Sequence, residues 1–256
     1  MAHTGQLGVN STCRRHEKRG SREKLASICG LPVAQLNRKL AAVGVKTETE
    51  NTHRGWRWLL VIVLSGAAIS LALLADANVA FWINANTSDR LRRFMRLVSR
   101  VGDWQGHFAA GSILVAIAWL QRSKRWMRVF LAMLIACALA GIVARAGKIA
   151  IGRPRPSTTT EQTWNGPNLH SEFNAFPSGH TASSTAFFVT LLIAAGWRIG
   201  TPLLFIPLLI GLSRMMVVAH YLSDVIGGFA VGIIAALFVA ERMQIPTTER
   251  IRKAGG

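Results

Sequence analysis

Apolar residues gather in six stretches that are separated by shorter polar and charged segments. The stretches cover residues 58–75, 107–120, 129–144, 181–197, 202–219 and 225–240. About 20 apolar residues in helical form cross the roughly 30 Å hydrocarbon layer of a bilayer. The pattern therefore predicts an all-α polytopic membrane protein with a bundle of six transmembrane helices. The second stretch is short, so its helix is expected either to begin earlier, near Trp104, or to be shielded by neighbouring helices.

Lysine and arginine residues flank these stretches unevenly. They are frequent in residues 1–55, in the turn after the second stretch and at the C-terminus, and six spans place all three on one side. Basic loops favour the cytoplasmic side. We therefore expect a basic cytoplasmic tail over 1–55, a membrane domain over 56–243 and a cytoplasmic C-terminal tail over 244–256. The loop before His180 then faces the periplasm, in a protein of the inner (plasma) membrane.

One arginine-rich segment falls on the outer side of this topology. In residues 88–101, five arginines are interleaved with apolar residues after Ser88, which has a side chain typical of a helix N-cap. The pattern predicts an amphipathic helix in the membrane interface, where it packs and anchors the protein; attraction of lipid headgroups is the alternative. A short helix is also expected after Pro32, with Leu36 and Leu40 on one face.

Composition narrows the choice of partner. Half of the 256 residues are hydrophobic, and the formal net charge is +18. Such a charge on a soluble protein suggests nucleic acid, but here many cations stand beside apolar stretches, which favours a lipid bilayer with anionic headgroups and no nucleic-acid partner. Residues 1–50 contain no apolar segment typical of a signal peptide, so the first span is expected to direct insertion. The three cysteines, Cys13, Cys29 and Cys137, lack C-x-x-C spacing and predict neither a disulfide framework nor a zinc site.

Ionisable side chains at the outer ends of the predicted spans are candidates for chemistry. His220 and Asp224 are four residues apart, a spacing that puts both on one face of a helix. The carboxylate can then accept the imidazole N–H and leave the other ring nitrogen free to attack. Arg214 precedes His220 by six residues, so we expect the helix to end between them. For a lone histidine and aspartate, a structural or solvated pair is the alternative.

A second group stands at the start of the fourth apolar stretch. Ser178 is a candidate N-cap, and the N-terminus of a helix offers free backbone N–H groups and a positive dipole end to a phosphate. Gly179 lets the backbone approach an anion closely, and His180 stands beside it with a proton to give. Taken alone, a plain helix cap is the alternative.

A third group lies at the end of the third stretch. Lys148 and Arg155 bracket a Gly-Arg-Pro sequence at 152–154, where the proline is expected to end the helix. Both cations are then free to converge on an anion. A positively charged loop flank is the alternative for this pair.

Together the three groups resemble the three-part signature of the PAP2 (type 2 phosphatidic acid phosphatase) family. The matching parts are Lys148-x6-Arg155-Pro156, Pro177-Ser178-Gly179-His180 and Ser213-Arg214-x5-His220-x3-Asp224, in that order. The resemblance implies that His220 attacks phosphorus, that Asp224 orients it and that His180 protonates the leaving oxygen. It implies a phosphate-binding set without metal or other cofactor, made of Lys148, Arg155, Ser178, Gly179 and Arg214. The soluble vanadium haloperoxidases of the family are disfavoured by the predicted spans.

The expected activity is that of a membrane lipid phosphate or pyrophosphate phosphatase that forms a phosphohistidine intermediate. By resemblance, the candidate substrates are undecaprenyl pyrophosphate, phosphatidylglycerol phosphate, phosphatidic acid and lipid A. A lipid phosphotransferase on the same site is the alternative within the family. A non-enzymatic transporter is the alternative of a different class, and it is disfavoured because the candidate residues gather at one membrane face.

The other histidines do not extend this site. His107 and His170 could join His180 in a metal site, but their spacing is not that of metal ligands. His170, Glu172 and Trp164 lie in the loop next to the site, where they could touch the substrate headgroup.

Overall fold

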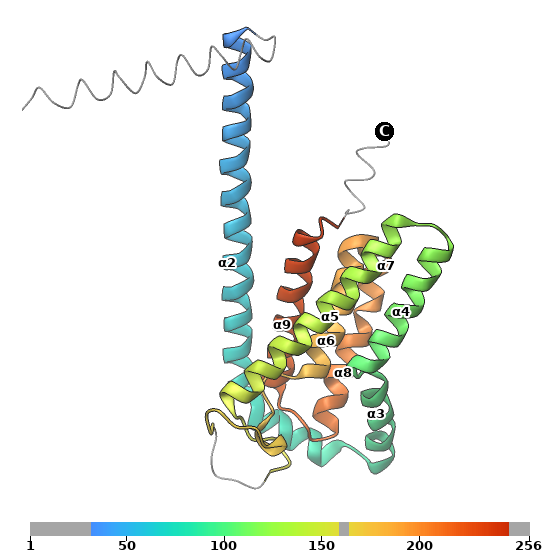
Figure 1. The fold of residues 1–256 in the computed structure, drawn as a ribbon. Coiled ribbons are helices and arrows are strands. Elements are labelled where there is room, and N and C mark those ends of the chain that lie inside the picture. The colour runs from blue at the N-terminus through green and yellow to red at the C-terminus, as the bar shows by residue number, and fades with distance from the viewer. Residues whose placement is uncertain (1–31, 159–163, 246–256) are drawn as a thin grey trace, which may run out of the picture. The chain divides into compact units, whose positions relative to one another are not determined.

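The computed structural model describes residues 32–158 and 164–245, and every regular element in these ranges is a helix (Figure 1). In chain order they are α2 (Val33–Asn86), α3 (Asp89–Val101), α4 (Trp104–Leu120), α5 (Lys124–Ile151), the single 3₁₀ turn η1 (Ser171–Phe173), α6 (Gly179–Ala195), α7 (Trp197–Leu203), α8 (Phe205–Met216) and α9 (Leu222–Arg242). The predicted all-α class is confirmed. Cys13 and Cys29 lie outside the described residues.

Apolar helices coincide with all six predicted stretches. Four helical segments of the described chain are long and apolar enough to cross a bilayer, namely Gly55–Asn86, Lys124–Ile151, Trp197–Met216 and Leu222–Arg242. Two more, Trp104–Leu120 and Gly179–Ala195, are apolar but shorter. The start of α4 at Trp104 agrees with the prediction. By length alone, therefore, four of the six predicted spans qualify.

Helix α2 is much longer than the short helix expected after Pro32. It continues for 54 residues, from Val33 to Asn86, and no proline interrupts that sequence. The chain divides into two compact units, Met1–Leu60 and Val61–Gly256. Each contact described below lies within the second unit.

The helical segment that overlaps the predicted fifth span begins earlier, at Trp197, and consists of two helices. Helix α7 ends at Leu203 and α8 begins at Phe205, so the helix is interrupted at Leu204. Pro207 explains the break, because it has no N–H to donate to the carbonyl of Leu203 and its ring crowds that carbonyl. The apolar pattern continues through Pro202 and Pro207, so the pattern alone does not reveal this interruption.

Helix α5 ends at Gly152, two residues before the proline that was expected to end it. Gly152 adopts a left-handed conformation with φ of 61° and ψ of 43°. A Cβ atom at this position would collide with the carbonyl oxygen of Gly166. A glycine is therefore required both by the backbone conformation and by the close approach of the loop.

Helices α5, α6 and α9 surround a core of small side chains. Ala136 and Ala140 of α5 and Ala182 and Ala186 of α6 are fully buried. On α9, a Cβ atom at Gly228 would lie only 2.7 Å from the carbonyl oxygen of Ser178, and one at Gly232 only 2.6 Å from that of Ala182. The backbones of α6 and α9 are therefore in direct contact, which places the first turns of the two helices side by side.

Helix α3 is the amphipathic helix predicted from the arginine-rich segment. Its N-cap is Ser88, whose Oγ accepts a hydrogen bond from the backbone N–H of Leu91 (3.3 Å). Met95 and Ser99 are buried, and α3 packs against α8. The predicted packing role is confirmed, and attraction of headgroups by the arginines stays a prediction.

Candidate active site

A cavity of about 810 Å³ lies between α4, α5, α6 and α8 and the loops that follow α5 and α8. Its wall includes six of the eight predicted site residues: Lys148, Arg155, Gly179, His180, Arg214 and His220. Ser178 and Asp224 are not in the wall; both are fully buried beside it. The two histidines expected to flank one phosphoryl group thus face the same cavity, although 40 residues separate them in the sequence.

His220 lies in the connection between α8 and α9 and is not part of a helix. The expectation that His220 and Asp224 share a helical face was wrong in this respect, because α9 begins only at Leu222 after the N-cap Tyr221. The two side chains still meet: Nδ1 of His220 lies 3.5 Å from Oδ2 of Asp224, without the geometry of a hydrogen bond. Arg214 belongs to α8, which ends at Met216, so the predicted helix end between Arg214 and His220 is confirmed.

The surroundings of His220 favour the neutral imidazole. The residue is almost fully buried, and burial, followed by the cations Lys148, Arg214 and Arg155, lowers the pKa of His220 well below its ordinary value. A charged form is costly there because it loses its hydration and meets like charges. The neutral ring keeps the lone pair that a nucleophile needs.

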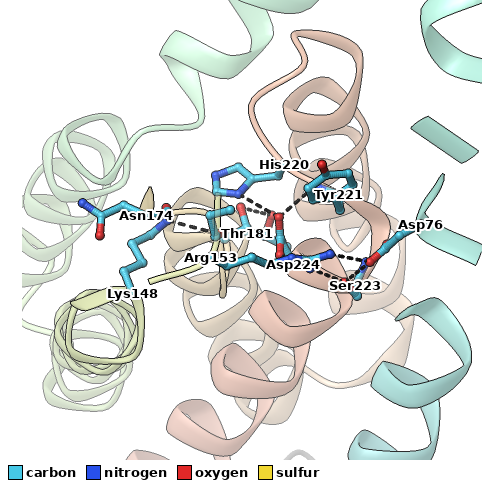
Figure 2. Close-up of polar contacts among 11 residues, drawn as sticks. Asp76, Lys148, Arg153, Asn174, Thr181, His220, Tyr221, Ser223 and Asp224 are labelled. Carbon is cyan, nitrogen blue, oxygen red and sulfur yellow. Dashed lines mark hydrogen bonds and ion pairs between the residues drawn. The ribbon is translucent and has the colours of Figure 1, made fainter. Parts of the chain in front are cut away.

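Asp224 is held by partners other than His220. Its Oδ1 accepts a hydrogen bond from Nη1 of Arg153 (2.6 Å), and its Oδ2 accepts one from the backbone N–H of Tyr221 (2.8 Å), as Figure 2 shows. The second bond is part of a capping box at the start of α9. These two hydrogen bonds hold Asp224 in position without a contribution from the imidazole of His220.

Sequence reasoning missed two residues behind Asp224. Arg153 stands out in the sequence only as part of the Gly-Arg-Pro loop, yet it forms an ion pair with Asp76 of α2, with Nη2 2.7 Å from Oδ2 (Figure 2). Asp76 follows directly after the predicted first span, whose apolar stretch ends at residue 75. A signal was present, because an ionisable residue inside a membrane helix indicates function by default.

The start of α6 is built differently from a simple capped helix. Ser178 occupies the predicted N-cap position, but its Oγ makes no capping bond and accepts a hydrogen bond from the hydroxyl of Thr181 (2.9 Å). Its backbone N–H donates to the backbone carbonyl of Asp224 (2.9 Å). Ser178 thus joins α6 to α9, while Gly179 and His180 are the residues that line the cavity.

His180 faces an acidic residue that the sequence analysis did not single out. Asp103 is the N-cap of α4, and its Oδ1 lies 3.5 Å from Nε2 of His180. Asp103 also lines the cavity. The second histidine therefore has its own carboxylate, supplied by a different helix from the one behind His220.

Four cations line the cavity, namely the three predicted ones and Arg145 of α5. Lys148 donates from Nζ to the backbone carbonyl of Asn174 (2.6 Å), and Arg214 donates from Nη1 to Oγ of Ser99 (2.5 Å). The Nε atoms of Arg155 and Arg214 are buried and have no hydrogen-bond partner in the described part of the chain. These groups leave donor capacity for an anion.

The loop residues named as possible headgroup contacts are not in the cavity wall. His170, Glu172 and Trp164 are absent from the lining, which receives Ser171 and Asn174 from this loop. Trp164 instead stacks on the guanidinium of Arg153, whose Cζ lies 5.0 Å from the ring centre. Over residues 32–158 and 164–245, no group of three or more His, Cys, Asp or Glu side chains could hold a metal ion.

Comparison with known proteins identifies relatives of this arrangement. The profile of the PAP2 superfamily matches residues 126–246. The chain is 30% identical over 202 residues to "Lipid A 1-phosphatase" of Rhizobium etli, covering 69% of this chain and 80% of that protein. It is 36% identical over 104 residues to "Lipid A 1-phosphatase" of Rhizobium johnstonii, covering 39% of this chain and 42% of that protein.

A solved structure shares the fold. The PAP2 type phosphatidylglycerolphosphate phosphatase of Bacillus subtilis, a transmembrane protein, matches with a TM-score of 0.56 and 20% identity, over 73% of this chain and 94% of that one. The likeness and the apolar helices make this chain a multi-pass membrane protein. Since the Rhizobium etli relative is matched over four-fifths of its length and the family profile covers the cavity-lining histidines, the chain belongs to the PAP2 superfamily.

Proposed function

We propose that this protein is a membrane lipid phosphatase that works through a phosphohistidine on His220, with lipid A carrying a 1-phosphate as the leading substrate. The observation that carries the proposal is that one cavity is lined by two histidines and four cations, Arg145 among them, from distant parts of the chain. The activity as a membrane phosphatase is supported by the family and by the names of the relatives. The choice of lipid A follows those names alone.

In the proposed complex, the phosphoryl group sits among Lys148, Arg155 and Arg214. Their positive charges offset the charge on the non-bridging oxygens, which is the main source of catalysis in phosphoryl transfer. The first turn of α6 at Gly179 adds backbone N–H groups and the positive end of the helix dipole. These donors do the electrostatic work for which other phosphatases use a metal ion, so we expect activity without one.

The reaction proceeds in two steps. In the first, Nε2 of neutral His220 forms a bond to phosphorus as the bond from phosphorus to the lipid oxygen breaks. His180, which is protonated when the anionic phosphate and Asp103 both lie beside it, gives that oxygen its proton. In the second, His180 takes a proton from water while the water oxygen attacks phosphorus, the P–N bond breaks, and inorganic phosphate leaves with His220 neutral again. Nδ1 of His220 faces Asp224, which leaves Nε2 as the attacking atom.

The cavity also suits a lipid. Besides the polar groups, it is lined by Trp104 and Phe108 of α4 and by Ala138, Gly141 and Ile142 of α5. An apolar wall between two membrane helices gives the hydrocarbon part of the substrate a place beside the reacting phosphate. This feature favours a lipid phosphate over a water-soluble one.

The proposal predicts that the purified protein releases phosphate from lipid A 1-phosphate in the presence of EDTA. His220→Ala should lower the rate at least about 1,000-fold, because losing the nucleophile abolishes the covalent route. The matched control is His170→Ala, an exposed histidine outside the cavity wall, which should keep the wild-type rate. Inorganic phosphate would be measured in detergent micelles over a panel of lipid monophosphates and diphosphates.

Strict dependence on an added metal would reject the mechanism, and equal rates in His220→Ala and wild type would reject the nucleophile. The same panel tests the phosphotransferase alternative. With radiolabelled donor lipid, a hydrolase passes the label to water, whereas a phosphotransferase passes it to an added acceptor lipid.

A further inference from the structure

A buried chain of charges runs behind the cavity, from α2 through the loop after α5 to the start of α9 (Figure 2). Arg153 is its centre. Nη2 pairs with Oδ2 of Asp76 (2.7 Å) and Nη1 with Oδ1 of Asp224 (2.6 Å). Asp76, Arg153 and Asp224 are 5%, 6% and 0% exposed, so water does not screen these pairs.

Arg153 is held on every side. Nη1 also donates to Oγ of Ser223 (2.6 Å), and the guanidinium carbon lies 4.4 Å from the ring centre of Tyr221 and 5.0 Å from that of Trp164. Arg153 does not line the cavity, so its role is not to bind the substrate phosphate. The planar guanidinium of Arg153, fixed between two aromatic rings, can hold two carboxylates in a set geometry. The single ammonium group of a lysine cannot do this.

Asp76 holds the first turn of α9 as well as Arg153. Its Oδ1 accepts a hydrogen bond from the backbone N–H of Ser223 (2.8 Å), and its Oδ2 accepts one from the Ser223 hydroxyl (2.5 Å). Ser223 is the residue before Asp224. A single carboxylate of α2 therefore fixes both the cation and the backbone that position Asp224 opposite His220.

The charge balance gives this arrangement a chemical consequence. Two carboxylates and one guanidinium leave one net negative charge in a buried site next to His220. When His220 becomes phosphorylated its ring turns cationic, and that net negative charge stabilises it. If Asp76 were neutral, Arg153 would cancel the charge of Asp224, and the imidazole would be left with the nearby cations Lys148, Arg155 and Arg214.

We propose that Asp76 and Arg153 are positioning residues of the phosphatase reaction, which fix Asp224 and leave its charge available to the phosphorylated ring of His220. This inference rests on the proposed function, because it assigns the two residues to the reaction in which His220 is the nucleophile. A membrane-helix aspartate far from the signature residues in sequence thereby becomes part of the same site.

The test is the isosteric variant Asp76→Asn in the full-length protein, which keeps the shape and removes the charge. We expect kcat for phosphate release to fall about 10- to 100-fold, the range for losing one charged hydrogen bond. KM and the inhibition constant of orthophosphate should stay within about twofold, since Lys148, Arg155 and Arg214 are untouched. Rapid quenching with a radiolabelled lipid phosphate should show less phosphohistidine. Glu241→Gln, on the exposed last turn of α9, is the matched control.

Burying an unpaired Arg153 could also weaken the fold. Thermal melting in detergent is therefore measured on the same preparation. Arg153→Lys, which keeps the positive charge but lacks the planar guanidinium, serves as a second variant. We expect a folded Arg153→Lys protein with a similar loss in kcat and the same affinity for orthophosphate.

Three results are decisive. A folded Asp76→Asn or Arg153→Lys protein with the wild-type kcat would overturn the inference while leaving the phosphatase proposal intact. Parallel loss of kcat and of orthophosphate affinity would also overturn it, because a merely structural role damages the whole site. Absence of phosphatase activity in the wild-type protein would instead reject the proposed function.

Discussion

Two properties of its surroundings determine the charge that His220 favours. It is buried to 3% exposure, and it lies among three cations that would each repel a proton on its ring. Asp224, which could favour the protonated ring, is shared with Arg153 and the backbone of Tyr221. These surroundings favour a neutral His220 ring in the free protein, which is the form that the proposed attack on a phosphoryl group requires.

This environment predicts the pH dependence of the reaction. Protonation of His220 stops the attack, and a lowered pKa moves that protonation to lower pH. We expect the acid limb of kcat/KM, which reports the free enzyme, to lie below about pH 6.5, the ordinary value for histidine. The charged and titratable groups that face the ring are Asp224, Lys148, Arg155, Arg214 and His180.

The measurement is a pH profile of phosphate release at low lipid concentration. The lipid phosphate titrates near pH 6 itself, so its ionisation is followed by phosphorus NMR in the same micelles and divided out. An acid limb centred at or above about pH 6.5 after this correction would contradict the lowered pKa of His220.

At the scale of the elements, the contact between α6 and α9 holds the site together. A valine at Gly232 would place its Cβ 2.6 Å from the Ala182 carbonyl oxygen and 2.6 Å from Thr185 Cβ. We expect Gly232→Val to cost about 1–3 kcal/mol of stability, as overpacking does. Activity should fall too, because the start of α9 moves away from Ser178. Thermal melting and phosphate release check both effects.

A glycine in open space provides the comparison for this variant. A Cβ atom at Gly66 of α2 would have no neighbour within 4 Å, so Gly66→Val should change neither melting nor activity by much. Equal stability of Gly232→Val and wild type would contradict the direct contact between the two helices.

Helix ends show what the sequence could and could not predict. Apolar stretches and the Ser88 cap located the helices, because burial and capping are properties of neighbouring residues. The end of α5 was predicted two residues too late, because the stop was expected at Pro154 and the helix already ends at the left-handed C-cap Gly152. The break at Leu204 could have been predicted from Pro207, whose effect falls on the residue four positions earlier.

At the scale of the whole molecule, the cavity combines the proposed phosphate site with an apolar wall. Gly141 lies in that wall, and a Cβ there would lie 3.2 Å from Oγ of Ser183. We expect Gly141→Leu to lower kcat/KM for a long-chain lipid phosphate about tenfold or more, because the side chain occupies space meant for the hydrocarbon. The rate with the short substrate para-nitrophenyl phosphate should change less than about twofold.

Measuring both substrates on one preparation separates blocking from misfolding, which would lower both rates. Val143→Leu, at an exposed position of the same helix outside the cavity wall, is the matched control. Equal losses for the long and the short substrate in Gly141→Leu would contradict an acyl-binding role of this wall.

The site as a whole was predicted from the sequence only in part. The signature residues were found because they resemble a family pattern, and six of them line one cavity. Asp76 and Asp103 were not found, because their partners Arg153 and His180 lie 77 residues further along in each case. Such pairs are set by how helices pack, so the position of Asp76 inside a membrane helix marks it as unusual but does not reveal its partner.

The hydrogen bond between Arg214 and Ser99 has a consequence for where the enzyme works. Ser99 belongs to α3, whose other faces present exposed arginines and apolar side chains, among them Phe94 and Leu97. A lipid that shifts α3 would also shift the guanidinium of Arg214, because the hydroxyl of Ser99 joins the two. We therefore expect the rate of phosphate release to depend on the detergent or lipid that surrounds α3, and rates measured in different detergents test this expectation.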